Sequence, residues 1–459
     1  MGQSHVVFDI GSSKIAGVYA DINTNGDINI ISRSVKYAGG FEYGEIINMQ
    51  EAYNSIMDVI YELEQNSRVS IKSATLVISN SSFRSFYVSA SSSLASEIIT
   101  KSDIQKIINK AIASFNIDGF EIIHYEVTEF ILNGNKSVVN PLNLRADTIS
   151  CSIHLIAGEV FTLNNLSKCF ENCHVEIENI LPSVYPSSVA SVNYDERNQG
   201  VTVIDIGSHI TGMAVFIAGK IIYIAHIEKA AVDITKKIAK KFSLDIKRAE
   251  RIKILYCSSL FKHNHSKDKI IKFNNSNLLS EDTNIRYGDI DNIIDEVISE
   301  ICTKLKLKYD DLSVDEMVAN KVVITGGGSR LPNIKNIVSN IFNKKIDISD
   351  ARILDKISIF GENNIFNNKS DVNNINNGYN DVVNNLSNSP SIINDNNVAR
   401  SLHVRNNNVA NIYDDNYIYL SAYGGLIIKS LQYSQESFIS DESSNLWYNK
   451  IISWLKNNL

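Results

Sequence analysis

The chain has 459 residues, of which 44% are hydrophobic and 21% charged, a composition typical of globular proteins with room for more than one core. Its formal net charge is −7, so the body of the chain offers no electrostatic footprint for nucleic acid. Five cysteines without a CxxC pair argue against a disulfide framework and favour a reducing compartment. No window approaches the roughly 20 apolar residues that span a bilayer, and a strand-like run begins near the N-terminus, so we expect neither a membrane span nor a signal peptide.

An internal echo is the most informative feature of the first half. Residues 6–12, VVFDIGS, recur at 201–208 as VTVIDIGS. A second apolar run follows each copy, at 15–19 and at 211–217. Each copy is therefore predicted to be a β-hairpin with a tight turn at its glycine. The repetition indicates a duplicated design with a ligand between the two halves.

The remaining patterns are mixed. Helical periodicity covers 51–64, 101–114, 234–242 and 290–307, whereas strand-like runs cover 74–79, 149–156 and 321–325. The fold class is therefore α/β. From 361 to 411 the sequence is Asn-rich and aperiodic, and we expect a disordered insertion there. Apolar sequence resumes at 417–427, which is predicted to form a core helix of the second half.

Three glycine-containing turns have the chemistry of a phosphate site. Asp9 to Lys14, DIGSSK, combines a carboxylate that could hold Mg²⁺ through water, a turn open to phosphate, and a lysine that offsets its charge. Asp205 to Ser208 repeats that turn. The third follows the strand at 321–325, where Gly326-Gly327-Gly328 would let the backbone approach a base or sugar, and a helix beginning there would favour an anion. Each turn alone could be a plain connection; the three in this order favour one nucleotide site.

With these elements in this order, the chain resembles the actin-like ATPase superfamily and, within it, the FtsA family. KRAERIK at 247–253 is similar to the FtsA segment whose Glu and Lys contact adenosine, which implies that role for Glu250 and Lys253. EIIH at 121–124, followed by Asn133-Gly134 and Asn140-Pro141-Leu142, is similar to the subdomain called 1C that FtsA inserts into its first lobe. We expect His124 to be a structural histidine with satisfied hydrogen bonds rather than a catalytic one.

The resemblance implies a duplicated, ribonuclease H-like two-lobe fold that binds ATP and Mg²⁺. The expected nucleotide-binding residues are Asp9, Gly11, Ser12, Ser13, Lys14, Asp205, Gly207, Ser208, Thr211, Glu250, Lys253, Gly326, Gly327, Gly328 and Ser329, with Asp9 holding Mg²⁺ through water. No catalytic residue can be named.

Several positions depart from the family pattern. His209 stands where the family has a glycine beside the phosphate, and it either closes the phosphate site or borders it. Ala230 and Ala231 replace two further glycines, and Cys257 a third. These departures weaken the case for hydrolysis more than the case for binding, so weak or no ATPase activity is expected.

The last fifteen residues, 445–459, form an amphipathic pattern behind a polar tether. One helical face carries Trp447, Tyr448, Ile451, Ile452, Trp454 and Leu455. Such a face suits the acyl boundary of a membrane, with nearby lysines at anionic headgroups, and FtsA proteins end in a targeting helix of this kind. The alternative is a terminal helix that packs on its own domain.

The resemblance implies a domain division. The expected segments are a first lobe (1–84, 157–198), subdomain 1C (85–156), a second lobe (199–233, 308–360, 412–430), a small subdomain 2B (234–307), the insertion (361–411), a linker (431–444) and the membrane helix (445–459).

The implied function is a polymerising cell-division protein, located at the division site on the inner face of the cytoplasmic membrane, that tethers the FtsZ ring there. Implied partners are the FtsZ C-terminal peptide, bound on 2B, other division proteins, further copies of the chain and membrane lipids, but no nucleic acid. The alternatives are a PilM-type scaffold of a pilus or secretion machine, a DnaK-type chaperone and a sugar kinase. A terminal membrane helix disfavours the first; the chain lacks a substrate-binding β-domain for the second and a catalytic-base motif for the third.

Overall fold

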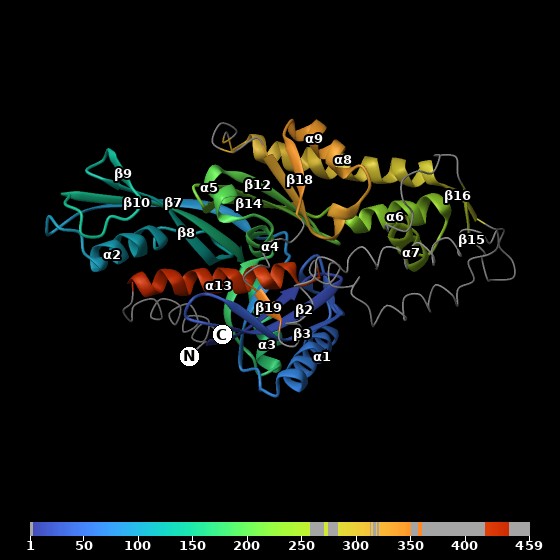
Figure 1. Cartoon of the computed structure of the whole chain (residues 1–459), viewed down its shortest axis with the longest axis horizontal. Helices are drawn as coiled ribbons and strands as arrows, with labels where there is room; N and C mark the ends of the chain where they lie inside the picture. Colours follow the sequence, from blue (N-terminus) through green and yellow to red (C-terminus); the bar gives the residue numbers. More distant parts are fainter. Residues whose placement is uncertain are drawn as a thin grey trace, which may run out of the picture.

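The structure is a computed structural model. It describes residues 3–257, 270–273, 283–312, 314, 318, 321–349, 357–359 and 418–439. The predicted Asn-rich insertion and the predicted membrane helix with its six apolar residues lie outside these ranges. Figure 1 shows two sheet-based halves, with helix α13 running between them and a third sheet extending to one side.

The first half is a six-stranded sheet in the order β11-β6-β1-β2-β3-β19. Its elements are β1 (Gln3–Ile10), β2 (Lys14–Ile22), β3 (Ile28–Tyr37), α1 (Met49–Ser67), β6 (Ser73–Ile78), α3 (Val160–Asn172), β11 (Glu176–Pro182) and β19 (Ile357–Ile359). β1 pairs antiparallel with β2 and parallel with β6. Because β1 is buried on both faces from Val6 to Ile10, it reads as a continuous apolar run broken only by Asp9.

The second half repeats this arrangement. Its five-stranded sheet has the order β14-β13-β12-β17-β18. The elements are β12 (Val201–Ile206), β13 (Thr211–Ile217), β14 (Lys220–Ile227), α6 (Ala231–Phe242), α7 (Ile246–Cys257), β15 (Ile270–Phe273), β16 (Thr283–Arg286), α8 (Tyr287–Asp310), β17 (Lys321–Thr325), η2 (Gly327–Arg330), α9 (Ile334–Phe342) and β18 (Lys345–Ile348). β12 pairs antiparallel with β13 and parallel with β17, as β1 does with β2 and β6. The duplication predicted from the echoed motif is therefore present in the topology.

Two short helices lie in the chain between the two sheets, and a small hairpin follows β3 within the first half. They are α4 (Val184–Ser191), α5 (Tyr194–Gln199), and the hairpin β4 (Phe41–Glu42) and β5 (Glu45–Ile46). α4 packs against β12 and β13 of the second half and against α13 (Leu420–Ile439). It therefore connects the two halves at their centre.

The third sheet lies between β6 and α3 in the chain and has the order β7-β10-β8-β9. It comprises β7 (Arg84–Ser93), β8 (Phe120–Leu132), β9 (Lys136–Val138) and β10 (Thr148–Glu159), covered by α2 (Lys101–Ile112). A capping box at Thr100 and Asp103 begins α2, whose buried face packs on this sheet as a separate core. This is the segment predicted to form the inserted subdomain.

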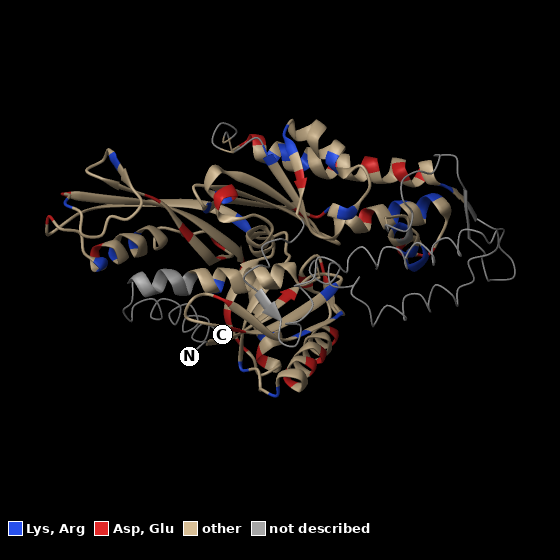
Figure 2. Cartoon of the chain, viewed as in Figure 1, with Lys and Arg blue, Asp and Glu red and all other residues tan. Residues whose placement is uncertain are grey.

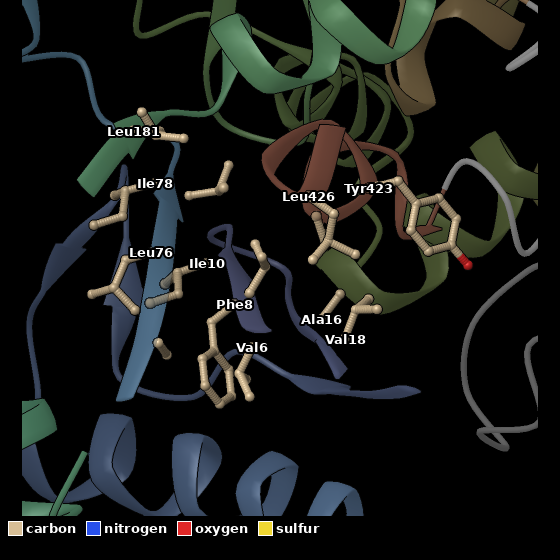
Figure 3. Packing of buried hydrophobic residues seen from close by; sticks show 14 of the residues in the cluster. Val6, Phe8, Ile10, Ala16, Val18, Leu76, Ile78, Leu181, Tyr423 and Leu426 are labelled. Carbon is tan, nitrogen blue, oxygen red and sulfur yellow. The ribbon is translucent and has the colours of Figure 1, made fainter. Parts of the chain in front are cut away.

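The C-terminal part of the described chain differs from the prediction. α13 contributes Tyr423 and Leu426 to the core of the first half, where Figure 3 shows Leu426 close to Ala16 and Val18. A Cβ on Gly425 would lie 3.0 Å from Val7 Cγ1, so this helix sits directly on β1. β19 likewise pairs with β3 of the first sheet. Residues 357–359 and 420–430 thus belong to the first half, not the second.

α13 also continues further than predicted. It ends at Ile439, whereas the sequence placed the start of a linker at 431. The stretch from 431 to 439 contains neither glycine nor proline to end a helix, which explains why the helical conformation persists through its polar residues.

Candidate functional site

The two echoed motifs form matching turns. In the first turn (residues 11–13, between β1 and β2), the Gly11 amide donates to the Lys14 carbonyl oxygen at 3.0 Å. In the second turn (residues 207–210, between β12 and β13), the Gly207 amide donates to the Ile210 carbonyl oxygen at 3.1 Å. Both hairpins and their glycine turns are as predicted from the sequence. In each hairpin the first strand ends one residue after an aspartate, which is Asp9 in β1 and Asp205 in β12.

Asp9 and Asp205 are brought together with Lys14 between the halves. Burial raises the pKa of Asp9 to about 6, with the Lys14 ammonium opposing this and the Asp205 carboxylate adding to it. Burial also raises the pKa of Asp205, opposed by the hydroxyl of Ser187 and by Lys14. Burial lowers the pKa of Lys14, and the two aspartates oppose that shift. Two buried carboxylates therefore share one ammonium group, an arrangement that an additional cation would stabilise.

The glycine turn (residues 326–328) lies against the second of these aspartates. Gly326 has φ +82°, and a Cβ built there would lie 2.3 Å from Asp205 Oδ1. A Cβ on Gly328 would lie 2.3 Å from Ile206 Cγ2, whereas one on Gly327 would meet nothing within 4 Å. Gly326 and Gly328 are thus required for packing, and Gly327 faces open space.

The segment after the glycine turn differs from the expected helix start. The chain makes the four-residue 3-10 turn η2, in which the Ser329 amide and hydroxyl both donate to the Gly326 carbonyl oxygen, and α9 begins only at Ile334. Leu331 is extended, as expected for a residue that precedes a proline, here Pro332. The turn is therefore closed by its own hydrogen bonds.

Helix α6 docks on the second turn through its first amides. The Ala231 amide donates to the Gly207 carbonyl oxygen at 3.3 Å and the Val232 amide to the Ser208 carbonyl oxygen at 2.8 Å. Thr211, after the turn, donates its hydroxyl to the Lys229 carbonyl oxygen at 2.7 Å. The contact needs no side chain at 230 or 231, which explains how the chain tolerates alanine at both positions.

Glu250 and Lys253, the predicted adenosine contacts, lie on α7 and join this cluster. Lys253 Nζ donates to the Ala231 carbonyl oxygen at 3.1 Å and pairs with Glu250 at 2.8 Å. Glu250 also accepts a hydrogen bond from the hydroxyl of Thr235 on α6. Through Ala231 these two side chains are connected to the second turn. The structure thus connects Glu250 and Lys253 to the second turn through α6, and a single site formed by all four segments stays a prediction.

His209, in the second turn, contacts the β4–β5 hairpin of the first half. Its ring packs edge-on against Tyr43, with centroids 5.3 Å apart and ring planes at 88°. Burial lowers the pKa of His209, as do Lys236 and Lys253, while Glu42 and Asp233 oppose the shift. These neighbours lie on the β4–β5 hairpin, α6 and α7.

Two groups at the site carry no motif signal in the sequence. Ser187, on α4, is 1% exposed and lowers the pKa of Asp205 by hydrogen bonding. Tyr43 and Gly44 form the tip of the β4–β5 hairpin, and the Gly44 amide donates to Ser12 Oγ at 3.2 Å. The two residues of this turn are Tyr-Gly, not the Asn-Gly or Asp-Gly pair that is typical of a hairpin, so local sequence did not predict it.

His124 lies on β8 of the third sheet and is half-buried. Its ring packs against Tyr185 with centroids 5.1 Å apart, and burial lowers its pKa to about 4. Its Nε2 atom is buried without a hydrogen-bond partner, so the structural role expected from the sequence stays a prediction. Cys169 is buried in α3 and Cys173 is buried directly after it, and the described part of the chain contains no group of three or more His, Cys, Asp or Glu that could hold a metal ion.

The residues present fit a nucleotide with a divalent cation. Burial raises the pKa values of the Asp9 and Asp205 carboxylates, and Mg²⁺ prefers such oxygen ligands, often through water. Gly327 leaves space at which a base or sugar could approach closely. Two duplicated sheets with facing hairpin turns and a glycine turn define an actin-like protein.

Comparison with known proteins agrees with an actin-like protein and indicates one family within this class. The model described as "Cell division protein FtsA" matches residues 202–373, and that of the "SHS2 domain inserted in FTSA" matches residues 80–157. FtsA of Pseudomonas aeruginosa is 22% identical over 345 residues, which cover 75% of this chain and 82% of that protein. FtsA of Borreliella burgdorferi is 27% identical over 341 residues, covering 74% and 82%.

Among solved structures, a chain of the PilM-PilN type IV pilus biogenesis complex superposes with a TM-score of 0.53 at 13% identity, covering 78% of this chain and 91% of that one. This likeness concerns the fold alone. The two family models together cover more than half of the sequence, and this chain belongs to the FtsA family. It is an actin-like cell-division protein. Within the described residues, no helix is long and apolar enough to cross a membrane.

Proposed function

We propose that this protein binds ATP with Mg²⁺ between its two halves and that the bound nucleotide supports polymerisation at the cell-division site. The observation that carries this proposal is the meeting of Asp9, Asp205 and Lys14, because two buried carboxylates beside a single ammonium group form a site that requires further cationic charge. The duplicated turns on either side provide backbone amides for a phosphate chain.

The proposed roles follow from the positions of the side chains. Asp9 holds Mg²⁺ through water, and Lys14 offsets phosphate charge. Glu250 and Lys253 bind the adenosine, with Lys253 held by the Ala231 carbonyl oxygen beside the second turn. Phosphate contacts are proposed for residues 11–13, 207, 208 and 211, and base or sugar contacts for residues 326–329.

The nucleotide proposal can be tested with fluorescent ATP and Mg²⁺. Gly327→Ala should weaken binding at least about tenfold while the melting temperature changes little, because the new methyl group enters open space beside the site. The control is Val139→Ala, because Val139 is 86% exposed in the connection between β9 and β10. If the parent chain binds neither ATP nor ADP, the proposal is wrong.

At the cellular level we propose that filaments of this protein tether the FtsZ ring to the inner face of the cytoplasmic membrane and recruit other division proteins. Family membership supports this proposal, and so does the amphipathic sequence at 445–459. The FtsZ C-terminal peptide would bind the region of 234–307. A single short helix binds lipid weakly, so stable attachment would depend on many helices presented together by a filament.

The membrane proposal is tested by co-sedimentation with anionic vesicles, with and without ATP and Mg²⁺. The full chain should pellet, more so with nucleotide, and a version ending at Ser444 should not. Ile452→Glu and Ser453→Glu form a matched pair, because each adds one negative charge to the same helix but only Ile452 lies on the predicted apolar face. Equal pelleting of both variants would contradict the amphipathic helix. If the full chain itself stays in the supernatant, a scaffold that docks to a membrane protein, as in the PilM-type alternative, becomes the better proposal.

A further inference from the structure

A small contact across the two halves stands at the edge of the proposed nucleotide site. Tyr43, at the tip of the β4–β5 hairpin of the first half, packs edge-on against His209 of the second turn. Lys236 of α6 donates to the hydroxyl of Tyr43 at 3.3 Å. A second contact joins the two halves, in which Ser81 Oγ donates a hydrogen bond to Glu228 Oε1 at 2.5 Å.

The backbone at Tyr43 is unusual for its residue type. Its φ of +50° lies in the left-handed region, where a two-residue hairpin turn normally has Asn, Asp or Gly. Gly44 follows with φ +78°, and a Cβ there would lie 1.9 Å from the Ser79 carbonyl oxygen. A bulky aromatic residue held in this conformation points to a role for its ring, since a smaller residue would suit the turn better.

The hairpin tip is connected to both proposed phosphate turns. The Gly44 amide donates to Ser12 Oγ of the first turn at 3.2 Å, and the buried Asn80 side chain donates to the Gly44 carbonyl oxygen at 3.1 Å. On the other side, His209 is itself part of the second turn. A phosphate group bound to Ser12 would act on the hairpin that carries Tyr43, and one bound to the second turn would act on His209. A phosphate chain that contacts both turns would therefore affect both partners of the Tyr43–His209 contact.

We propose that Tyr43, His209 and Lys236 form a latch that holds the two halves closed over bound nucleotide and slows its release. The latch rests on the proposed nucleotide function and adds to it a device that sets the residence time. His209 replaces the glycine of the family pattern, and its ring neighbours are on the β4–β5 hairpin, α6 and α7. Its side chain thus closes the edge of the site by touching the opposite half.

The test measures dissociation of N-methylanthraniloyl-ATP from the full chain with Mg²⁺, by chasing with unlabelled ATP. Tyr43→Ala and His209→Ala should each raise the dissociation rate at least fivefold. The double variant should release nucleotide no faster than the faster single variant, because each substitution already removes the same contact between the two rings. Tyr43→Phe, which keeps the ring but loses the acceptor for Lys236, should have an intermediate rate. Tyr61→Ala is the control, since Tyr61 is 64% exposed on α1.

The outcomes separate the two proposals. In one outcome, the parent binds nucleotide while Tyr43→Ala and His209→Ala release it at rates within twofold of the parent rate. That result would overturn the latch and leave the nucleotide proposal standing. Independent, multiplicative effects of the two substitutions would also overturn it. A parent chain that binds no nucleotide would overturn both. Circular dichroism and melting temperatures of each variant establish that a faster release is not caused by unfolding.

Discussion

The Lys14 ammonium group donates a hydrogen bond to the main-chain oxygen of Ile418, which connects the end of the first turn to the start of α13. The same ammonium lies beside Asp9 and Asp205. One side chain thus serves both the proposed phosphate site and the attachment of the C-terminal helix. Substitutions at this position should affect both.

Lys14→Met should weaken Mg²⁺-ATP binding by about tenfold or more, because it removes a charge-assisted contact to phosphate. It should also speed amide hydrogen exchange at the start of α13, which loses its bond to Lys14. Binding is measured by fluorescence titration and exchange by mass spectrometry. Lys36→Met is the control, because Lys36 pairs with Glu62 at the partly exposed surface. Unchanged exchange in α13 would show that Lys14 does not hold the helix.

Asp9 should make the ligand-free protein less stable as the pH rises from about 4 to about 6. Its pKa is raised from 3.8 to about 6, so in this interval the folded state binds more protons than the unfolded state, and the free energy of unfolding falls as pH rises. The loss is complete about one pH unit above the pKa of about 6 and amounts to at most about 3 kcal/mol.

Asp9→Asn should reduce this slope to the part that Asp205 contributes, melt at a higher temperature than the parent at pH 7.5, and bind Mg²⁺-ATP more weakly. Thermal unfolding from pH 4.5 to 7.5 without nucleotide measures the effect. Asp118→Asn serves as the control, because Asp118 is exposed in the connection before β8. A parallel pH dependence in Asp9→Asn and the parent would contradict the assignment.

Gly326→Ala should destabilise the fold by about 2 kcal/mol or more, since it places a methyl group in a left-handed conformation against Asp205. Gly327→Ala should change the free energy of unfolding by less than about 0.5 kcal/mol. Urea unfolding of the two variants provides the comparison. Equal destabilisation would mean that the glycine turn is not packed against Asp205 as described.

Gly424→Ala distinguishes helix propensity from helix packing. Propensity alone predicts a gain of about 1 kcal/mol for alanine within α13. The added Cβ would instead lie 1.9 Å from the Pro186 carbonyl oxygen of α4, so we expect a net loss of stability of about 1–3 kcal/mol. Urea unfolding decides the sign, and a more stable variant would show that α13 does not approach α4 this closely.

Local patterns predicted much of this protein. The echoed Asp-x-Gly-Ser motifs indicated two hairpins and a duplication, because turn chemistry and alternating apolar residues act over a few neighbouring positions. The helix at α8 and the strand at β17 were recognisable for the same reason. The glycine turn was also evident, although the delay of α9 to Ile334 depended on Leu331 and Pro332.

The tertiary structure alone decided which distant surfaces meet. An apolar run such as 417–427 states that a helix will be buried but not against which sheet, and packing with Val7 and Pro186 assigned α13 to the first half. The raised pKa of Asp9 required the approach of Asp205 and the exclusion of water, neither of which is encoded at short range. Tyr43 and His209 are 166 positions apart in the chain, and only the closing of the two halves against each other brings their rings into contact.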